Sequence, residues 1–517
     1  MALGSESMSA GHILATRGAS LPWRGATIII PALIGILALW LRLHGLGDKP
    51  FWLDEMLTVE RASRPVEQLV QDSLVSRHYP SYFLLVHGVT ALGTDEWMVR
   101  LPSALFGALG VAVAARIAAE ISGHRAALIT GILMALSPFE VQFSQEARSH
   151  MLVSCLILVA LWGMVRIAGK PATEAQPRRR WILTAPWAAY VFGTSAALNV
   201  LSVAIPWLLV SNLIMGKILS RNRQDRKALL GRWATAQTVV LVIWLPMAIL
   251  LYLASRGTIV QGFAWIPKIT THDLWSIAAA VYLFRISDMV TLDLLPTLLP
   301  GFGIVVATAA AWGAWRLRRN RTMLAVVGLA AIAMPVTLLL VSLFHPMLVP
   351  RYLTWSTGPY YVLAGIGMAA LRPAALFAIA SVALVAGGAA CLAPYYDLDT
   401  KPRWDLAVAY LTQHVEPGDA VITSAPYATY MVSSYGERFH FDEKALVPRL
   451  DFSGATDRLA NGKRVWLVHG RASQGQITSR EVFFGRYADL GPPAMQLTFG
   501  EHIIVLRYDP TLAIEMP

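Results

Sequence analysis

Long apolar runs recur along the whole chain, and they restrict what it can fold into. Eleven predominantly apolar stretches fit helices that cross a bilayer core of about 30 Å. Only 15% of the residues are charged, against about 25% in soluble domains, and 56% are hydrophobic. The sequence therefore predicts a polytopic α-helical membrane protein. The predicted spans are residues 26–43, 98–121, 126–140, 150–168, 184–198, 200–216, 234–254, 293–315, 323–344, 353–371 and 373–394.

Basic residues in alternate loops predict how the chain crosses the membrane. They are Arg17, Arg24, His124, Arg125, Lys170, Arg178, Arg179, Arg180, Lys217, Arg221, Arg223, Arg226, Lys227, Arg232, Arg316, Arg318, Arg319, Arg321 and Arg372. With eleven spans all of these lie on one side, which the positive-inside rule makes the cytoplasm. We expect a cytoplasmic N-terminus without a cleaved signal peptide. The net charge of +11 then reflects topology, so no nucleic-acid partner is expected.

The composition changes after about residue 395. WDLAVAYLTQHV has the pattern of an amphipathic helix, and AVITS, RVWLVHG and HIIVLRY have the pattern of short buried strands. The sequence therefore predicts two domains, a transmembrane domain over residues 1–395 and a small α/β domain over residues 396–517. The predicted topology places the second domain outside the cytoplasm.

The first outer loop, residues 44–97, holds two further helical patterns. Residues 79–92 are apolar but span only about fourteen residues, which is too short for an ordinary membrane span. We expect interfacial helices there and over residues 64–75. The alternative is that residues 79–92 form a twelfth span, which would invert the topology of everything that follows.

An acidic pair, Asp54-Glu55, follows the first span by about ten residues. Two solvated loop carboxylates are the plainer interpretation, but the flanking sequence FWLDEM is apolar. Carboxylates close to membrane spans are costly and usually mark a functional site. We therefore predict Asp54 as a general base that takes a proton from an acceptor hydroxyl. Glu55 would orient the acceptor or hold the base in place.

Cationic side chains fall in the other outer segments. His78 precedes an interfacial helix, whose positive end suits a phosphate, although such a histidine is often only structural. Arg148 and Arg351 lie in two further outer segments, and an arginine fork matches phosphate oxygens. Arg100 lies at the outer end of the second span, where it could simply reach for the membrane surface. We predict that His78, Arg148, Arg351 and Tyr352 bind a phosphate, with Arg100 and Glu146 in support.

Several common site types have no motif in this chain. There is no Walker loop, no dinucleotide fingerprint, no HExxH and no CxxC. Both cysteines, Cys155 and Cys391, lie in apolar runs, so we expect no disulfide framework. No cofactor is predicted. A divalent metal bound by Asp54, Glu55 and Glu146 stays open, because the spacing of these carboxylates is unspecific.

The order of the motifs resembles a known family. A first span, an outer Asp-Glu pair, H-x-P, R-L-P-S-A-L, Q-E-A-R and P-R-Y-L follow one another in this chain as in the bacterial family 39 glycosyltransferases. That family has the GT-C membrane fold and is related to the protein O-mannosyltransferases and the aminoarabinose transferase of lipid A. The resemblance covers about residues 26–372, and WDLAVAYLTQHVEPGDAVI resembles the C-terminal domain of many bacterial members.

The resemblance implies an inverting transfer of a sugar from a polyprenyl monophosphate. The acceptor would be a hydroxyl on a lipid, glycan or protein of the cell envelope, deprotonated by the aspartate that matches Asp54. Residues matching His78, Arg148, Arg351 and Tyr352 would hold the donor phosphate, and Arg100 matches an arginine beside the active site. The enzyme would lie in the bacterial inner membrane, with its active site and C-terminal domain periplasmic.

Two positions depart from the family pattern. The usual H-P-P-L is H-Y-P-S at His78–Ser81, and the aspartate that follows the arginine matching Arg148 in mannosyltransferases is missing. Whether Glu146 replaces it stays open. A transporter or flippase of lipid-linked sugars is the alternative function. Transporters usually show duplicated halves and charges near mid-membrane, and this sequence shows neither.

Overall fold

Helices form most of the chain up to Asp397. The computed structural model describes residues 26–169, 181–256, 266, 268–447, 451–470 and 480–510. The basic residues Arg17, Arg24, Lys170 and Arg178 to Arg180, which entered the topology prediction, lie outside the described residues.

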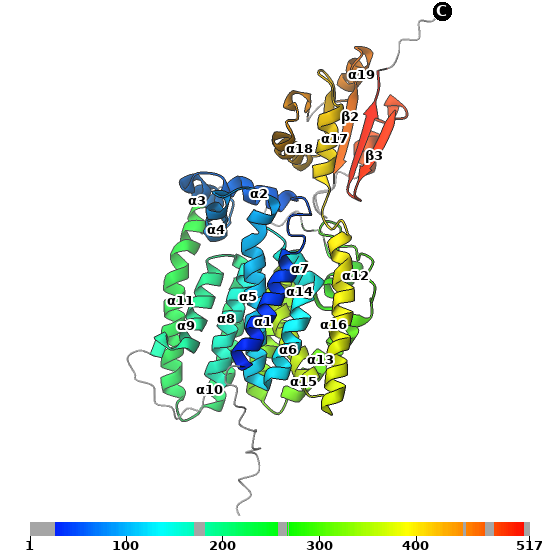
Figure 1. Cartoon of the computed structure of the whole chain (residues 1–517). Helices are drawn as coiled ribbons and strands as arrows, with labels where there is room; N and C mark the ends of the chain where they lie inside the picture. The colour runs from blue at the N-terminus through cyan, green and yellow to red at the C-terminus, as the bar shows by residue number, and fades with distance from the viewer. Residues whose placement is uncertain are drawn as a thin grey trace, which may run out of the picture.

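Each of the eleven predicted spans contains a helix, and these helices stand side by side as a bundle (Figure 1). Six helices of the described chain are long and apolar enough to cross a membrane, or seven if the bent pair α6–α7 counts as one span. The rest of the eleven are shorter. The helices are α1 (Ala26–Leu43), α5 (Glu96–Ser122), α6 (His124–Ala135), α8 (His150–Gly169), α9 (Ala185–Leu198), α10 (Ile205–Arg221), α11 (Arg226–Ala254), α13 (Phe302–Leu317), α14 (Arg321–Ser342), α15 (Thr354–Ala369) and α16 (Ala374–Asp397).

Proline interrupts the predicted spans at two places. The third span breaks before Pro138, and a second helix, α7 (Pro138–Ser144), continues at an angle of 61°. The Ser137 hydroxyl caps α7 by accepting a hydrogen bond from the Glu140 amide at 3.3 Å. The span predicted from residue 293 is helical only from Phe302, because two prolines in the preceding residues cannot donate helical hydrogen bonds.

Two glycines bring α13 and α15 into backbone contact. A side chain at Gly313 would collide with the carbonyl oxygen of Leu363, and one at Gly367 would collide with that of Ala309. In membrane bundles such small residues allow the close packing that replaces the hydrophobic effect. The position of α15 matters for function, because Arg351 lies just before it in the short 3-10 helix η3 (Pro350–Leu353).

Residues 44–97, the first loop predicted to be outside the cytoplasm, fold into three short helices at one end of the bundle (Figure 1). They are α2 (Leu53–Ala62), α3 (Val66–Val75) and α4 (Ser81–Thr90). The two helices predicted in this loop are therefore confirmed as α3 and α4, and their interfacial position stays a prediction. With ten residues, α4 is about 15 Å long, so the alternative of a twelfth span is wrong. The acidic pair was expected in a loop, whereas it lies in the first turn of α2.

A small domain stands at the same end of the bundle as α2, α3 and α4 (Figure 1). It holds a four-stranded sheet in the order β1-β2-β4-β3, with β1 parallel to β2 and the other pairs antiparallel. Three strands and α17 were predicted, while β3, an edge strand whose residues alternate between half-buried and exposed, was not. The elements are α17 (Trp404–His414), β1 (Ala420–Thr423), α18 (Pro426–Phe439), α19 (Phe452–Ala460), β2 (Val465–Gly470), α20 (Arg480–Gly485), β3 (Met495–Phe499) and β4 (Ile503–Tyr508).

Helix α12 and one linker complete the end of the bundle that carries α2, α3 and α4. Helix α12 (Thr271–Tyr282) begins with a capping box between Thr270 and Asp273. The linker, residues 398–403, joins α16 to α17. The division of the chain at residues 395 and 396 stays a proposal.

Candidate active site

Helix α2 presents the two members of the acidic pair to different partners. Asp54 and Glu55 lie in its first turn, where the helix dipole favours negative charge. Successive helical residues point about 100° apart. As a result Glu55 faces the protein interior and is fully buried, whereas the Asp54 side chain is 23% exposed.

The Glu55 carboxylate is held by four hydrogen-bond donors. Arg100 donates from Nε to Oε1 at 2.8 Å and from Nη2 to Oε2 at 3.0 Å. The Ala147 amide donates to Oε1 at 2.9 Å, and Lys401 Nζ donates to Oε2 at 2.8 Å. Burial would raise the pKa of Glu55, but Arg100 and Lys401 outweigh it and hold the pKa at about 2. Glu55 is therefore ionised at neutral pH, and its carboxylate is fully engaged by the protein.

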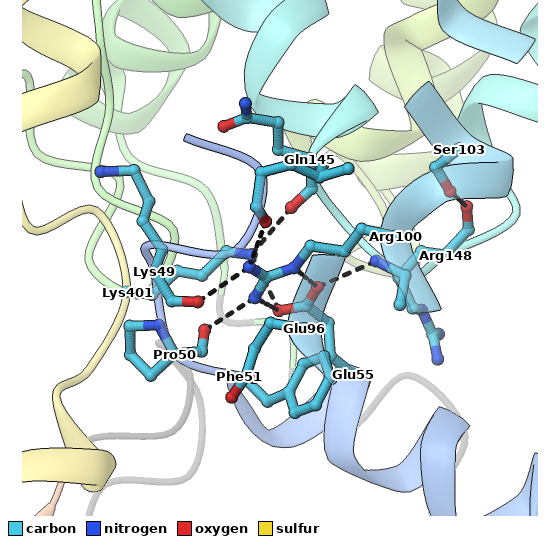
Figure 2. A network of polar contacts seen from close by, with 12 residues as sticks. Lys49, Pro50, Phe51, Glu55, Glu96, Arg100, Ser103, Gln145, Arg148 and Lys401 are labelled. Carbon is cyan, nitrogen blue, oxygen red and sulfur yellow. Dashed lines mark hydrogen bonds and ion pairs between the residues drawn. The ribbon is translucent and has the colours of Figure 1, made fainter. Parts of the chain in front are cut away.

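Arg100 uses all five of its N–H groups within this network (Figure 2). Besides Glu55, it donates to the backbone oxygens of Leu46 at 3.0 Å, Lys49 at 2.8 Å and Pro50 at 2.9 Å. It thereby fixes the loop that leads from α1 into α2. Arg100 therefore supports the site by holding Glu55 and this loop in place. None of its N–H groups remains available to bind a phosphate.

Asp54 lies between two guanidinium groups. Arg351 Nη1 donates to Asp54 Oδ2 at 2.5 Å, and Arg148 Nη2 is 3.8 Å from the same oxygen. Arg148 also donates from Nη1 to the Asp54 carbonyl at 3.3 Å and to Thr58 Oγ1 at 3.2 Å. The structure thus brings together residues 54, 148 and 351 at the end of the bundle that carries α2.

This setting keeps the Asp54 carboxylate charged. Burial raises its pKa, but the positive charges of Arg148 and Arg351 lower it further and leave it below the ordinary value. A free carboxylate at neutral pH can accept a proton, but a lowered pKa makes it a weak base. Any ligand that draws the two arginines away from Asp54 strengthens it as a base.

His78 lies beside Arg148 in a cavity of about 380 Å³. The cavity is lined by residues 77–79 and the first turn of α4, by the residues just before α8 and by those before α10, and it includes the hydroxyl-bearing Ser149 and Ser202. Burial, with the neighbouring charges of Arg148 and Arg61, lowers the pKa of His78 to about 4. The imidazole is therefore neutral at pH 7 and can donate one hydrogen bond.

A second cavity, of about 490 Å³, lies beside Arg351. Its lining includes Arg351, which also lies over the Trp52 ring at 5.6 Å. The remaining wall is formed mostly by apolar side chains from α7 and the outer segments 287–292 and 349–350. Asp54 is therefore in contact with one arginine from each cavity.

Glu146 and His150 lie near Asp54 without hydrogen-bond partners among the described residues. Both carboxylate oxygens of Glu146 and both ring nitrogens of His150 are buried and unpartnered. Burial, opposed by the charge of Lys401, raises the pKa of Glu146 to about 7. The Tyr352 ring is 6.4 Å from that of His150. Such orphaned polar atoms are rare in folded proteins and are often found at functional sites.

Comparisons with known proteins give one family match in sequence and several matches in fold. Residues 77–249 match the model of the dolichyl-phosphate-mannose-protein mannosyltransferase family. The match includes His78, Arg100 and Arg148, while Asp54 and Arg351 lie outside it. No curated protein gives a match in sequence.

Two solved structures have the same architecture. ArnT from Cupriavidus metallidurans, bound to undecaprenyl phosphate, superposes with a TM-score of 0.53 at 17% identity, over 94% of this chain and 99% of ArnT. The Archaeoglobus fulgidus oligosaccharyltransferase AglB, in complex with an inhibitory peptide and a dolichol-phosphate, gives 0.52 at 11% identity, over 85% of this chain and 69% of AglB. The chain has the GT-C fold. The resemblance to GT-C glycosyltransferases that the sequence predicted is confirmed.

The three acidic residues of this GT-C site do not form a metal centre. Glu55 is turned into the Arg100 network, and Asp54 is paired with Arg351. Across the residues that the structure describes, no three His, Cys, Asp or Glu side chains are grouped so that they could hold a metal ion. The divalent-metal site considered for Asp54, Glu55 and Glu146 therefore finds no support in this geometry.

Several residues of this GT-C site were not singled out in the sequence. The acidic pair or its arginines are contacted by Lys401, Trp52 and Thr58. His150 lies near Asp54. Thr58 follows Asp54 by one helical turn, so recognising α2 would have indicated it. Lys401 is a single lysine in a linker, about 350 residues away from Glu55 along the chain, and no local sequence pattern marks it.

Proposed function

We propose that this chain is an inverting glycosyltransferase that moves a sugar from a polyprenyl monophosphate donor to a hydroxyl of a cell-envelope acceptor. Asp54 is the general base, and His78, Arg148, Arg351 and Tyr352 surround the donor phosphate. The acceptor is a lipid, glycan or protein. The enzyme lies in the bacterial inner membrane, with a cytoplasmic N-terminus and a periplasmic site and C-terminal domain.

One observation carries the proposal. The Asp54 carboxylate lies between the guanidinium groups of Arg148 and Arg351 at the end of an apolar bundle. A proton acceptor beside two phosphate-binding cations is what sugar transfer from a lipid phosphate requires. The ligands of the two structural neighbours, undecaprenyl phosphate and a dolichol-phosphate, support a lipid phosphate as the donor group.

These groups account for the proton, the new bond and the leaving group of the transfer reaction. The acceptor hydroxyl gives its proton to Asp54, and its oxygen attacks the anomeric carbon on the face opposite the phosphate. The bond between that carbon and the phosphate oxygen breaks, and its electron pair stays on the polyprenyl phosphate. The configuration at the anomeric carbon is inverted. The guanidinium groups stabilise the charge that develops on the leaving phosphate.

The charges of the site also suggest an order of binding. Without ligands, Arg351 and Arg148 compensate Asp54 and keep its pKa low. A donor phosphate competes for the same two arginines, which weakens their hold on Asp54 and raises its pKa. Donor binding therefore strengthens the base, and we expect the donor to bind before the acceptor.

The variant Asp54→Asn tests the proposal. We expect sugar transfer from a polyprenyl phosphate sugar to fall by about 10² to 10⁴-fold, because no general base is left. Binding of polyprenyl phosphate should be equal to wild type or tighter, because the competing carboxylate charge is gone. Both quantities are measured on purified protein in detergent or nanodiscs.

The control is Glu67→Gln, which removes an exposed carboxylate from the neighbouring helix α3. It should change neither transfer nor binding. Full transfer by Asp54→Asn would rule out Asp54 as the base. A loss of phosphate binding in that variant would contradict the competition between donor and carboxylate.

A further inference from the structure

The middle of the linker between the bundle and the C-terminal domain is buried in the protein. Thr400 and Lys401 are buried, with 0% and 1% of their surface exposed. The linker backbone is held at two further points. Lys49 Nζ donates to the Leu398 carbonyl at 2.5 Å, and the Met289 amide donates to the Thr400 carbonyl at 3.1 Å.

Lys401 reaches from this linker into the candidate active site. Its ammonium group donates to Glu55 Oε2 at 2.8 Å and to the Gln145 carbonyl at 3.1 Å. Glu55 lies next to Asp54 on α2, and Gln145 lies three residues before Arg148. One buried cation therefore connects the segment that carries the base with the segment that carries a phosphate-binding arginine.

The small domain strengthens the same connection. Tyr435 in α18 donates to the carbonyl oxygen of Phe51 at 3.2 Å, and Tyr430 donates to Glu60 in α2 at 2.7 Å. Arg438 forms two bonds with Glu96 at the start of α5, at 2.6 and 3.1 Å. The residues that lead into and out of the acidic pair are thus bonded to the C-terminal part of the chain.

We propose that Lys401 is a positioning residue for sugar transfer: it sets the place of Asp54 relative to Arg148 by bonding Glu55 and the Gln145 carbonyl together. This inference rests on the proposed function. Because only 1% of the Lys401 surface is exposed and its ammonium group is bonded to Glu55, we infer that it acts through Glu55 and not by contact with substrate. Errors of about 1 Å in such positions can cost about 100-fold in rate.

The charge of Lys401 adds a pH signature. Burial lowers its pKa from 10.5 to about 8. Below pH 8 the ammonium is charged and holds Glu55, and as the pH rises through 8 that attraction is lost. The titratable or charged groups facing it are Glu55 on α2, Glu146 in the turn before α8, Arg100 on α5 and Lys49 in the loop before α2.

The test compares Lys401→Met, which removes the charge at similar length, with Lys401→Arg, which keeps it. Lys401→Met should lower kcat for sugar transfer by about 100-fold while KM for the donor stays unchanged. Lys401→Arg should restore most of kcat. It should also keep kcat above pH 8, where wild type loses it, because an arginine stays protonated. The control Lys444→Met removes an exposed lysine and should behave as wild type.

A double variant separates positioning from folding. Lys401→Met leaves a buried carboxylate short of one cation, whereas Glu55→Gln with Lys401→Met removes both charges together. If Lys401 acts through Glu55, the double variant should lose no more kcat than Glu55→Gln alone. Additive losses, or wild-type kcat in Lys401→Met, would overturn the assignment.

Hydrogen exchange of α2 gives a readout that does not depend on activity. Amides of residues 53–62 should exchange at least about 10-fold faster in Lys401→Met than in wild type or Lys444→Met, because α2 opens more readily. Unchanged exchange would also overturn the assignment. If wild type transfers no sugar, the proposed function fails, while the exchange experiment still decides whether Lys401 holds α2.

Discussion

The two residues of the acidic pair have different roles. Glu55 accepts four hydrogen bonds and is inaccessible to solvent, so it holds the local structure. Asp54 remains partly exposed between Arg148 and Arg351, where a substrate can reach it. Of the two roles considered for Glu55, the geometry supports holding the base and not orienting the acceptor.

The residues that meet at Asp54 were indicated by the sequence because each occurs in an ordered motif. The topology placed the segments of His78, Arg148 and Arg351 on one side of the membrane, and the structure brings them to one end of the bundle. Burial of Glu55 was not predictable in the same way. It depends on Lys401, which reaches α2 only through the tertiary fold.

Arg351→Ala should weaken the binding of polyprenyl phosphate more than any other single change among the predicted phosphate ligands. The Arg351 side chain is only 13% exposed, so its charge is poorly screened by water. We expect the dissociation constant to rise by about 30-fold or more, the effect of losing about 2 kcal/mol from a buried charged contact. Titration of the purified protein with polyprenyl phosphate measures it.

The matched control is Arg256→Ala, at an exposed arginine just beyond α11. It should bind the lipid phosphate as wild type does. An unchanged dissociation constant in Arg351→Ala would remove Arg351 from the phosphate site and would leave it only as the partner of Asp54.

At the scale of elements, hydrophobic length predicted the bundle helices well, and tertiary contacts decided the rest. The sequence of α2, LDEMLTVERA, is too polar and short to be recognised as a span, and no side chain caps its start. Its first turn is instead fixed by Arg100, Lys401 and the Ala147 amide, which lie far away in sequence. The break between α6 and α7 carries a readable signal, a serine cap followed by proline.

The close contact of α13 and α15 gives a prediction at this scale. Gly367→Ala should destabilise the bundle by about 1–3 kcal/mol, because the added carbon collides with the Ala309 carbonyl. The thermal unfolding midpoint of the purified protein measures the change. Gly216→Ala in α10, where an added carbon meets nothing, should be neutral or slightly stabilising. Equal midpoints for both variants would show that the two helices separate without cost.

For the whole molecule, the sequence predicted the GT-C bundle and a small α/β domain, and the basic loops predict the orientation in the membrane. Cysteine labelling tests this orientation. Both native cysteines are buried, so an introduced one is the main target of a membrane-impermeant maleimide. In spheroplasts, Thr456→Cys on α19 should react at once, whereas Gln224→Cys between α10 and α11 should react only after lysis. Both positions are exposed on the protein surface, and the predicted topology puts them on opposite sides of the membrane.

A parent chain with both native cysteines and no addition serves as the control for background labelling. The reverse pattern, with Gln224→Cys labelled in intact spheroplasts, would place the acidic pair in the cytoplasm. A polyprenyl phosphate sugar presented outside the cytoplasm could then not reach Asp54.

The bond between Glu55 and Lys401 joins residues that are 346 positions apart. At a synthesis rate of about 5–20 residues per second, the ribosome adds the lysine roughly 20 to 70 seconds after the glutamate. During that interval the growing chain inserts nearly all of its membrane helices, while the Glu55 carboxylate is not yet paired with its second cation, Lys401. A nascent or prematurely terminated chain is thus a membrane bundle with an unfinished centre, and maturation of the centre is among the last events of its biogenesis.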